Sequence, residues 1–337
     1  MGTVARDGAD AWQLLVQTYT SEVNSPYLFE VAGLVLGLLL GSFLNVCISR
    51  VPQGESVVRP GSRCGSCGKA IRWYDNVPLL SWVVLRGRCR DCCAAISWRY
   101  PAVELAVGVW FAVQAGQLWE AFSFSLLSAG HMGTAFDVAS QVILHVGLAV
   151  LGWLLIGLLV MDWQTMLLPD AFTFSGMGIS FLLVCVQAVF LGPTEDQVIL
   201  GAHHLRLASP GNVVDHGNVF LTGPENMLGT WLVATVGAAA ILLMVRWLYK
   251  VVRHREGMGL GDVKLLAMMG AFLGFWPAVL SLFLGVVLAS AYSIVLLVRR
   301  RAGGATRVPL GSFLAMGGLI TALVGSHLID TYKSFLR

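Results

Sequence analysis

Two aspartates stand out because each interrupts apolar or glycine-rich sequence. Asp262 lies within Gly259-Leu260-Gly261-Asp262-Val263-Lys264, and Asp162 ends a long apolar run. An ionisable group beside membrane-depth sequence indicates a functional site by default. Closely spaced glycines let backbone approach another segment closely, and irregular backbone at that depth needs protein or a wet cavity around it. We therefore expect Gly259, Gly261 and Lys264 to form an active-site loop around Asp262.

A pair of carboxylates facing one water molecule can hydrolyse a peptide bond. Like charges close together do not readily ionise together, so the pair shares one proton. The ionised member takes a proton from water, and the protonated member donates to the scissile carbonyl oxygen. We expect Asp162 and Asp262 to form this catalytic pair. The alternative is that each aspartate caps a helix end at the membrane interface.

Four cysteines predict a metal site. Cys64 and Cys67 form one CxxC pair, Cys89 and Cys92 form another, and 21 residues separate the pairs. Two such pairs let four thiolates meet tetrahedrally around one zinc ion, and four protein ligands leave no position for a catalytic water. We therefore expect a structural zinc site. Cys93 offers an alternative to Cys92, but CxxC geometry needs two intervening residues and favours Cys92.

The composition defines the kind of scaffold that positions these groups. The chain has 337 residues, of which 56% are hydrophobic and 12% charged, and its mean hydropathy is +0.74. The charged fraction is about half the soluble norm of roughly 25%. This composition predicts an all-α polytopic membrane protein. The net charge of +3 is too small to indicate a nucleic-acid partner, and no internal repeat stands out.

About eight segments are long and apolar enough to predict transmembrane helices, each needing roughly 20 residues. The sixth is short and carries Asp262 and Lys264 near its start. The predicted segments are Leu28–Ile48, Pro101–Trp119, Val138–Met161, Phe172–Leu191, Met227–Leu248, Gly261–Trp276, Pro277–Val298 and Pro309–Ile329.

The positions of the basic residues predict the orientation. Of the 22 Lys and Arg residues, nine fall in residues 49–100, five in 246–264 and four in 299–308. Basic residues favour the cytoplasmic side. With eight spans and an external N-terminus, all three basic segments become cytoplasmic, and Asp162 and Asp262 reach that same face.

This topology divides the chain into four expected parts. The N-terminal segment lacks the basic start and cleavage site of a signal peptide, so the first span is expected to remain as a membrane helix. The parts are an external segment 1–27, a first transmembrane helix 28–48, a cytoplasmic zinc-binding domain 49–100, and a transmembrane aspartyl peptidase domain 101–330 with an external loop 192–226.

Two further charged residues have simpler roles in this scheme. Asp170 follows Pro169, and we expect it to cap the next helix at its N-terminus. Lys264 is either a counter-ion for a carboxylate or a lysine that reaches toward lipid headgroups.

At these residues the sequence resembles the type IV prepilin peptidases, which are GxGD-type intramembrane aspartyl proteases. Gly259-Leu260-Gly261-Asp262 matches the GxGD motif, and Asp162 with Pro169-Asp170 resembles the first catalytic stretch. Further matching stretches occur in family order: Gly41-Ser42-Phe43-Leu44-Asn45-Val46, Trp73-Tyr74-Asp75-Asn76-Val77-Pro78, and Arg99-Tyr100-Pro101 with Glu104.

The resemblance implies two activities on one chain. One is removal of the leader peptide from prepilins and pseudopilins at the cytoplasmic side of the bacterial inner membrane, with Asp162 and Asp262 as the catalytic pair. The other is N-methylation of the new N-terminus with S-adenosylmethionine, which accompanies the tetracysteine segment. No G-x-G-x-x-G motif follows a strand to locate the methyl-donor site, which stays unassigned. Pro309-Leu310-Gly311-Ser312 replaces the family's Pro-Phe-Gly-Pro, a departure that could alter substrate fit.

Two rival readings remain. One is a peptidase without the methyltransferase activity. The other is a non-enzymatic transporter, whose ionisable residues would lie near mid-span; His145 is the residue it would use, and a packing histidine is the simpler reading of that position.

Overall fold

The computed structural model describes residues 26–127, 134–190, 224–254, 259–299 and 308–335. The expected external segment and most of the expected loop 192–226 lie outside these residues. The described chain forms helices and short turns, with only two isolated β-bridges. Its long helices are α2 (Pro26–Arg50), α4 (Arg99–Leu127), α5 (Thr134–Thr165), α6 (Asp170–Phe190), α9 (Pro224–Arg253), α10 (Leu260–Leu273), α11 (Phe275–Val298) and α12 (Leu310–Phe335).

The long helices correspond one to one with the eight predicted apolar segments. Five of them, α2, α5, α6, α9 and α11, have the length and composition to cross a membrane. The prediction of an all-α, multi-pass membrane protein is therefore confirmed. Whether α4, α10 and α12 complete a set of eight spans stays a prediction.

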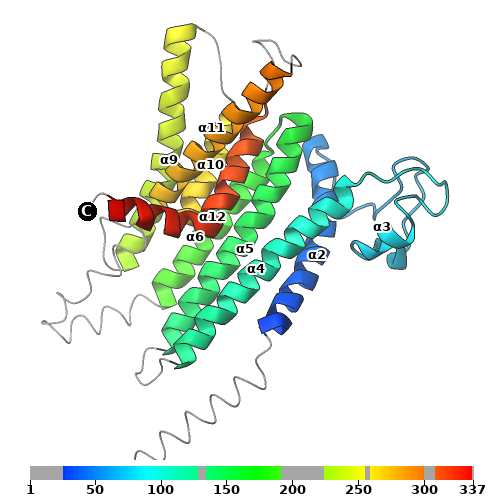
Figure 1. The fold of residues 1–337 in the computed structure, drawn as a ribbon, viewed down its shortest axis with the longest axis horizontal. Helices are drawn as coiled ribbons and strands as arrows, with labels where there is room; N and C mark the ends of the chain where they lie inside the picture. Colours follow the sequence, from blue (N-terminus) through cyan, green and yellow to red (C-terminus); the bar gives the residue numbers. More distant parts are fainter. Residues whose placement is uncertain (1–25, 128–133, 191–223, 255–258, 300–307, 336–337) are drawn as a thin grey trace, which may run out of the picture.

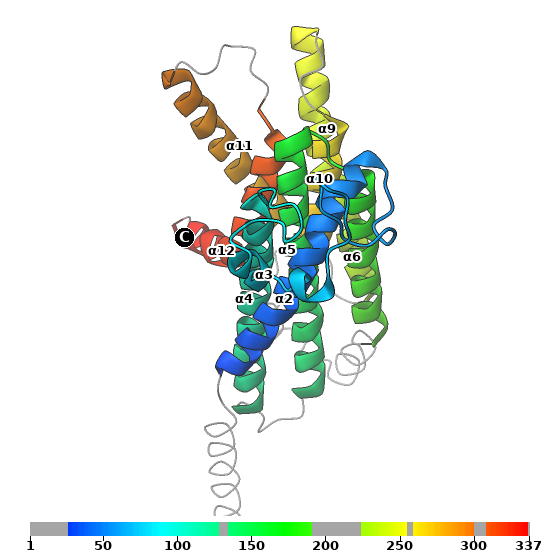
Figure 2. The same cartoon turned by 90° about the vertical axis from the view of Figure 1, so that its right-hand side faces the viewer.

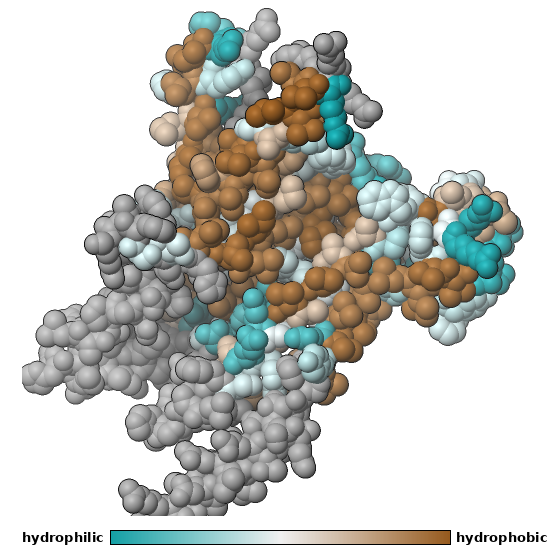
Figure 3. Space-filling view, viewed as in Figure 1, coloured by the Kyte–Doolittle hydropathy of each residue, from teal (hydrophilic) through white to brown (hydrophobic). Residues whose placement is uncertain are grey.

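Successive long helices run in opposite directions (Figures 1 and 2). As a result α2, α5, α9 and α11 end, and α4, α6, α10 and α12 begin, on the same side of the bundle. Residues 51–98 form a small domain on this side, between α2 and α4, that contains the short helix α3 (Leu80–Val84). Apolar side chains cover much of the bundle, whereas hydrophilic ones gather on the outer side of this domain (Figure 3).

Helices α2 and α4 pack closely along their length because glycines line the contact. Gly33, Gly37 and Gly41 recur every fourth residue on one face of α2. A Cβ atom on Gly37 would lie 2.6 Å from the carbonyl oxygen of Val107, and one on Gly41 would lie 2.8 Å from the Cα of Glu104. Small residues at this spacing allow membrane helices to approach backbone to backbone.

Helix α10 lies inside the bundle, in contact with α5, α6, α9, α11 and α12. Its 14 residues span about 21 Å at 1.5 Å per residue, which is less than the roughly 30 Å hydrocarbon thickness. Nine of them are buried, so the helix is shielded by protein from lipid. Gly274, with φ of +89°, ends it and starts the turn into α11, a backbone conformation that glycine adopts without strain.

Candidate active site

Asp162 lies in the last turn of α5, where the helix presents unpaired carbonyl groups. Its Oδ2 accepts hydrogen bonds from the backbone N–H of Ser312 at 2.7 Å and from the Ser312 hydroxyl at 2.9 Å. The residue is only 5% exposed. A carboxylate stabilises the N-terminus of a helix, not its C-terminus. A capping role therefore does not explain Asp162.

Asp262 is the third residue of α10, and Gly259 is the N-cap residue. The Asp262 carboxylate accepts a hydrogen bond from the backbone N–H of Gly259. This contact satisfies one of the N–H groups left unpaired at a helix start. The capping alternative thus describes part of what Asp262 does, although the residue is 9% exposed and buried in the bundle.

The ends of α5, α10 and α12 bring the two aspartates into one site. Leu168, in the turn after α5, packs against both Gly261 and Gly311. A Cβ on Gly261 would come within 3.0 Å of Leu168, and one on Gly311 within 2.8 Å of Leu168 and 3.0 Å of Asp162 Oδ2. The carboxylates are close enough for the charge of Asp162 to act on Asp262. Two glycines therefore provide the space in which the acidic side chains meet.

The surface next to the pair is half open. Trp163, which follows Asp162, is 50% exposed, and Leu260, two residues before Asp262, is 52% exposed. Both aspartates therefore lie just beneath the surface of the bundle, on the side where α5 ends and α10 begins.

Lys264 contacts the neighbouring helix. Its Nζ lies 2.6 Å from Asp170 Oδ1 and 5.2 Å from the ring centroid of Phe174. Asp170 is the first residue of α6, which agrees with its expected position at the start of a helix. Of the two roles open for Lys264, the geometry is that of a counter-ion, and the ion pair ties α10 to α6.

The four predicted zinc ligands converge in the small domain. The Sγ atoms of Cys64, Cys67, Cys89 and Cys92 all lie within 4.8 Å of one another, and those of Cys64 and Cys92 are 3.7 Å apart. A tetrahedral site with Zn–S bonds of about 2.3 Å separates its sulfur atoms by about 3.8 Å. The donor set and its spacing therefore fit a zinc ion with four thiolate ligands.

The two cysteine pairs lie on matching turns, which the sequence reasoning missed. Isolated β-bridges join Arg63 to Ala70 in one turn and Arg88 to Ala95 in the other, 25 residues later. The Arg-Cys-x-x-Cys-x-x-Ala-Ile-x-Trp pattern beginning at Arg63 recurs at Arg88. The expectation of no internal repeat was therefore wrong for this short pattern. The repeat covers only the two cysteine turns and is much shorter than a membrane span.

The same repeat favours Cys92 over Cys93 as the fourth member of the cluster. Cys93 has φ of +57° and occupies the place of Gly68, whose φ is +70°. Its backbone N–H donates to the carbonyl of Cys89 at 3.0 Å, as that of Gly68 does to Cys64 at 2.9 Å. Cys93 thus makes the turn, and the cluster contains Cys92.

Electrostatics in the cluster favour a bound cation. Hydrogen bonds from the backbone N–H groups of Cys67 and Ser66 lower the pKa of the Cys64 thiol to about 6. At Cys92 a hydrogen bond from Ala94 acts in the lowering direction, but burial and the other three sulfur atoms raise its pKa to about 12. One thiolate therefore forms readily, but the neighbouring sulfur atoms oppose the formation of a second. A bound metal ion removes this opposition, because its positive charge stabilises all four thiolates.

One polar contact attaches the small domain to the bundle, and another joins α2 to the start of α4, the two helices between which the domain lies. Glu104 Oε2 on α4 accepts a hydrogen bond from the backbone N–H of Leu79 at 2.8 Å. Asn45 Nδ2 on α2 donates to the carbonyl of Tyr100 at 3.0 Å. The sequence identified Asn45 and Glu104 only as parts of motifs. In the structure, each makes a hydrogen bond between separate elements.

His145, the residue a transporter would use, is paired inside the bundle. Its Nδ1 lies 3.1 Å from Gln114 Oε1, and both residues are buried. This contact joins α4 to α5 and fits a packing histidine.

Two family models match separate parts of the chain. A family model described as the bacterial peptidase A24 N-terminal domain matches residues 35–118, and one described as the type IV leader peptidase family matches residues 217–294. The first match contains the cysteine cluster and the second contains Asp262. Asp162 lies between them.

Several relatives that align with most of the chain are described as prepilin leader peptidase/N-methyltransferase. The chain is 31% identical to the protein of Stutzerimonas stutzeri, covering 93% of this chain and 97% of that one. It is 30% identical to that of Pseudomonas aeruginosa, covering 93% and 96%, and 34% identical to that of Myxococcus xanthus, covering 83% and 67%. The chain belongs to the prepilin leader peptidase/N-methyltransferase family. No solved structure gives a significant match.

Membership in the prepilin leader peptidase/N-methyltransferase family confirms the resemblance drawn from the motifs. It also gives context to the one departure at the site. The Pro-Phe-Gly-Pro with which the resemblance compared residues 309–312 ends in a proline, which has no N–H. Here that position is Ser312, whose N–H and hydroxyl both bind Asp162.

Proposed function

We propose that the chain removes the leader peptide of type IV prepilins and pseudopilins and then N-methylates the new N-terminus. The observation that carries the peptidase half is the meeting of Asp162 and Asp262 at one end of the bundle, beside two glycines that make room for them. Family membership supports both halves.

Asp162 and Asp262 would act as the hydrolytic pair. One carboxylate takes a proton from water, and the other, protonated, donates to the oxygen of the scissile carbonyl. Gly259 orients Asp262 through its N–H, and Ser312 orients Asp162 through two hydrogen bonds. Lys264, held by Asp170, fixes the start of α10.

The proposed site faces the cytoplasm from the bacterial inner membrane. The helix ends that hold the two aspartates lie on the same side of the bundle as the small domain. Basic residues at the described ends of α2, α9 and α11, namely Arg50, Arg253 and Arg299, also lie on this side, and basic flanks favour the cytoplasm. A prepilin has a basic leader followed by an apolar helix, so the bond to be cut lies at this interface.

The division of the chain into the four parts expected from the sequence remains part of this proposal. Helix α2 ends at Arg50 and α4 begins at Arg99, which supports a separate inner domain over residues 49–100. We propose that zinc, held by Cys64, Cys67, Cys89 and Cys92, is the structural ion of that domain, and that S-adenosylmethionine is the methyl donor.

The peptidase half is tested by changing each aspartate to the isosteric amide. Asp162→Asn and Asp262→Asn should each reduce leader cleavage by at least about a thousandfold. Each variant keeps only one carboxyl group, so the pair can no longer share a proton between two. Cleavage is measured on a purified prepilin with the enzyme in nanodiscs.

The matched control is Asp170→Asn, which makes the same chemical change outside the pair. It should lower cleavage by no more than about tenfold, because it weakens only the exposed ion pair that holds Lys264. Wild-type rates in either dyad variant would remove that residue from the mechanism.

A further inference from the structure

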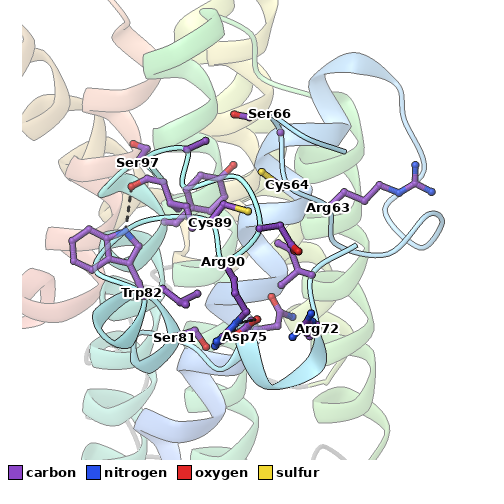
Figure 4. A pocket seen from close by; sticks show the side chains of 18 of the residues that line it. Arg63, Cys64, Ser66, Arg72, Asp75, Ser81, Trp82, Cys89, Arg90 and Ser97 are labelled. Atoms are coloured by element: carbon purple, nitrogen blue, oxygen red, sulfur yellow. Dashed lines mark hydrogen bonds and ion pairs between the residues drawn. The ribbon is translucent and has the colours of Figure 1, made fainter. Parts of the chain in front are cut away.

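A cavity of about 480 Å³ lies within the small domain, next to the start of α4. The two cysteine turns, the segment before α3, and the first residues of α4 surround it (Figure 4). Its volume falls within the roughly 300–1,000 Å³ typical of sites for small organic ligands. Asp162 and Asp262 do not line it, so the cavity is separate from the proposed peptidase site.

One end of the cavity carries fixed guanidinium groups. Arg90 makes a two-pronged ion pair with Asp75, with Nε to Oδ2 at 2.8 Å and a terminal nitrogen to Oδ1 at 2.6 Å. Arg72 donates to the hydroxyl of Tyr74 at 2.7 Å. Both guanidinium groups lie within 6 Å of the Tyr74 ring centroid, at 5.6 and 5.9 Å. Arginines held in place in this way suit a carboxylate ligand.

Asp75 is the group that holds Arg90. Its side chain is 8% exposed, and the hydrogen bond from Arg90 lowers the pKa of its carboxyl group. Asp75 is therefore ionised at neutral pH and keeps Arg90 in one orientation.

An aromatic and apolar wall lies across from Arg72 in Figure 4. The Trp82 indole N–H donates to the carbonyl of Ile96 at 3.2 Å, and Ile71 and Leu85 also line the cavity. A wall of this kind suits a flat heterocycle.

Arg99 joins the cavity to the proposed peptidase site. It lines the cavity, and one of its terminal nitrogens donates to the side-chain oxygen of Gln164, two residues after Asp162. Its Nε is buried without a hydrogen-bond partner among the described residues. A buried donor of this kind needs an acceptor, which a ligand in the cavity or a water molecule can supply.

We propose that this cavity binds the methyl donor, S-adenosylmethionine, with its carboxylate toward Arg72 and Arg90 and its adenine against the wall of Trp82 and Ile96. The assignment rests on the methyltransferase half of the proposed function. The donor is a nucleoside with a carboxylate, an ammonium and a sulfonium group, and the cavity combines guanidinium groups, carboxylates and an apolar wall. A site for the donor beside Gln164 also lies close to where the new N-terminus is released.

The methyl transfer needs no reactant other than the amine and S-adenosylmethionine. The lone pair of the neutral N-terminal amine attacks the methyl carbon, a C–N bond forms, and the C–S bond breaks. The bonding pair stays on sulfur and leaves S-adenosylhomocysteine, while the positive charge passes to nitrogen. The methylated amine then releases a proton to solvent when it returns to its neutral form.

The first test fills the cavity. Ala95 lines the cavity and is not buried, so Ala95→Trp should weaken S-adenosylmethionine binding by at least about tenfold, because the added ring takes the space of the ligand. Binding is measured by calorimetry on the full-length protein in nanodiscs, with leader cleavage and zinc content measured on the same sample. Cleavage and zinc should stay within about twofold of wild type.

The control is Val84→Trp, which adds the same ring to an exposed position of α3 outside the cavity and should leave binding unchanged.

The second test removes one charge inside the cavity and one outside it. Arg72→Gln should weaken binding by about tenfold, as expected for losing a charged contact to a carboxylate. Arg88→Gln removes the same charge next to a cysteine, and Arg88 is an exposed residue that does not line the cavity, so binding should be unchanged.

The outcomes separate the location of the site from the activity. If the wild type binds and transfers the methyl group and Ala95→Trp binds with equal affinity, the cavity is not the donor site and the proposed function stands. If Arg72→Gln and Arg88→Gln weaken binding equally, the proposed orientation is overturned. If the wild type cleaves the leader but neither binds the donor nor methylates, the methyltransferase half falls and this proposal falls with it.

Discussion

Ser312 shows how a single residue adapts the proposed catalytic pair in this chain. It lies in the first turn of α12, where its N–H has no partner within the helix. Both that N–H and the hydroxyl bind Asp162, and the hydroxyl is also 3.0 Å from the carbonyl of Leu159. Ser312 therefore holds the Asp162 carboxylate in one rotamer, and we regard it as a positioning residue.

Ser312→Ala removes the hydroxyl and keeps the backbone contact. A single hydrogen bond contributes about 0.5–1.5 kcal/mol net, and the backbone bond to Asp162 remains. We therefore expect kcat for leader cleavage to fall roughly twofold to tenfold, with KM unchanged. Steady-state kinetics on a prepilin measure both constants.

Ser312→Thr restores the hydroxyl and should recover most of kcat. A rise in KM without a change in kcat would mean that Ser312 contacts the substrate and does not position Asp162.

At the scale of elements, the attachment of the small domain depends on how closely α2 and α4 approach. Each glycine at 33, 37 and 41 would place a Cβ within 2.6–2.8 Å of α4 atoms. The close approach lets Asn45 on α2 reach the carbonyl of Tyr100 at the start of α4. The contact therefore sets the position from which the small domain extends.

Gly37→Ala should destabilise the protein although alanine is the better helix former. Overpacking in a tight contact destabilises by about 1–3 kcal/mol, which outweighs the roughly 1 kcal/mol by which alanine favours the helix. The measurement is the thermal unfolding midpoint in detergent.

Gly178→Ala in α6 is the matched control, because no atom lies within 4 Å of the added Cβ. It should unfold at the same temperature or higher. Equal stability in the two variants would show that α2 and α4 have room to move apart.

At the scale of the whole molecule, two sites share one side of a helical bundle. The bundle ends hold Asp162 and Asp262, while residues 51–98 hold the cysteine cluster and the cavity. The small domain has few buried apolar side chains of its own: the described residues from Val51 to Trp98 contribute none to the buried core. A domain without a core needs another source of stability, and a four-cysteine zinc site is a common one.

Cys64→Ser should release zinc and unfold the small domain while leaving the bundle helical. The loss of one thiolate removes a ligand from a four-coordinate site, and structural zinc binding is coupled to folding. Metal analysis, far-UV circular dichroism for the bundle, and proteolysis between α2 and α4 measure the three effects separately.

Cys93→Ser makes the same substitution beside the cluster and should keep the metal. Intact wild-type protein that contains no zinc would end the assignment.

Much of the site follows from local sequence alone. Apolar length predicted the long helices, because a membrane span requires about 20 such residues whatever its neighbours are. The CxxC spacing predicted the ligand set, because two intervening residues bring two thiolates to one ion. Gly-x-Gly-Asp indicated a functional loop, because charge and glycine both disfavour an ordinary membrane helix.

Other features were decided only by tertiary structure, because they join residues far apart in the chain. The pairing of Lys264 with Asp170 chose between two roles that the sequence left open. Ser312 contacts Asp162 across 150 residues, and nothing local marks a serine in an apolar helix as its partner. The cavity forms only when both cysteine turns pack against the start of α4. Periodicity and spacing therefore determined which groups the chain carries, and packing determined which of them meet, since a hydrogen bond or a cavity depends on distances that a linear pattern does not contain.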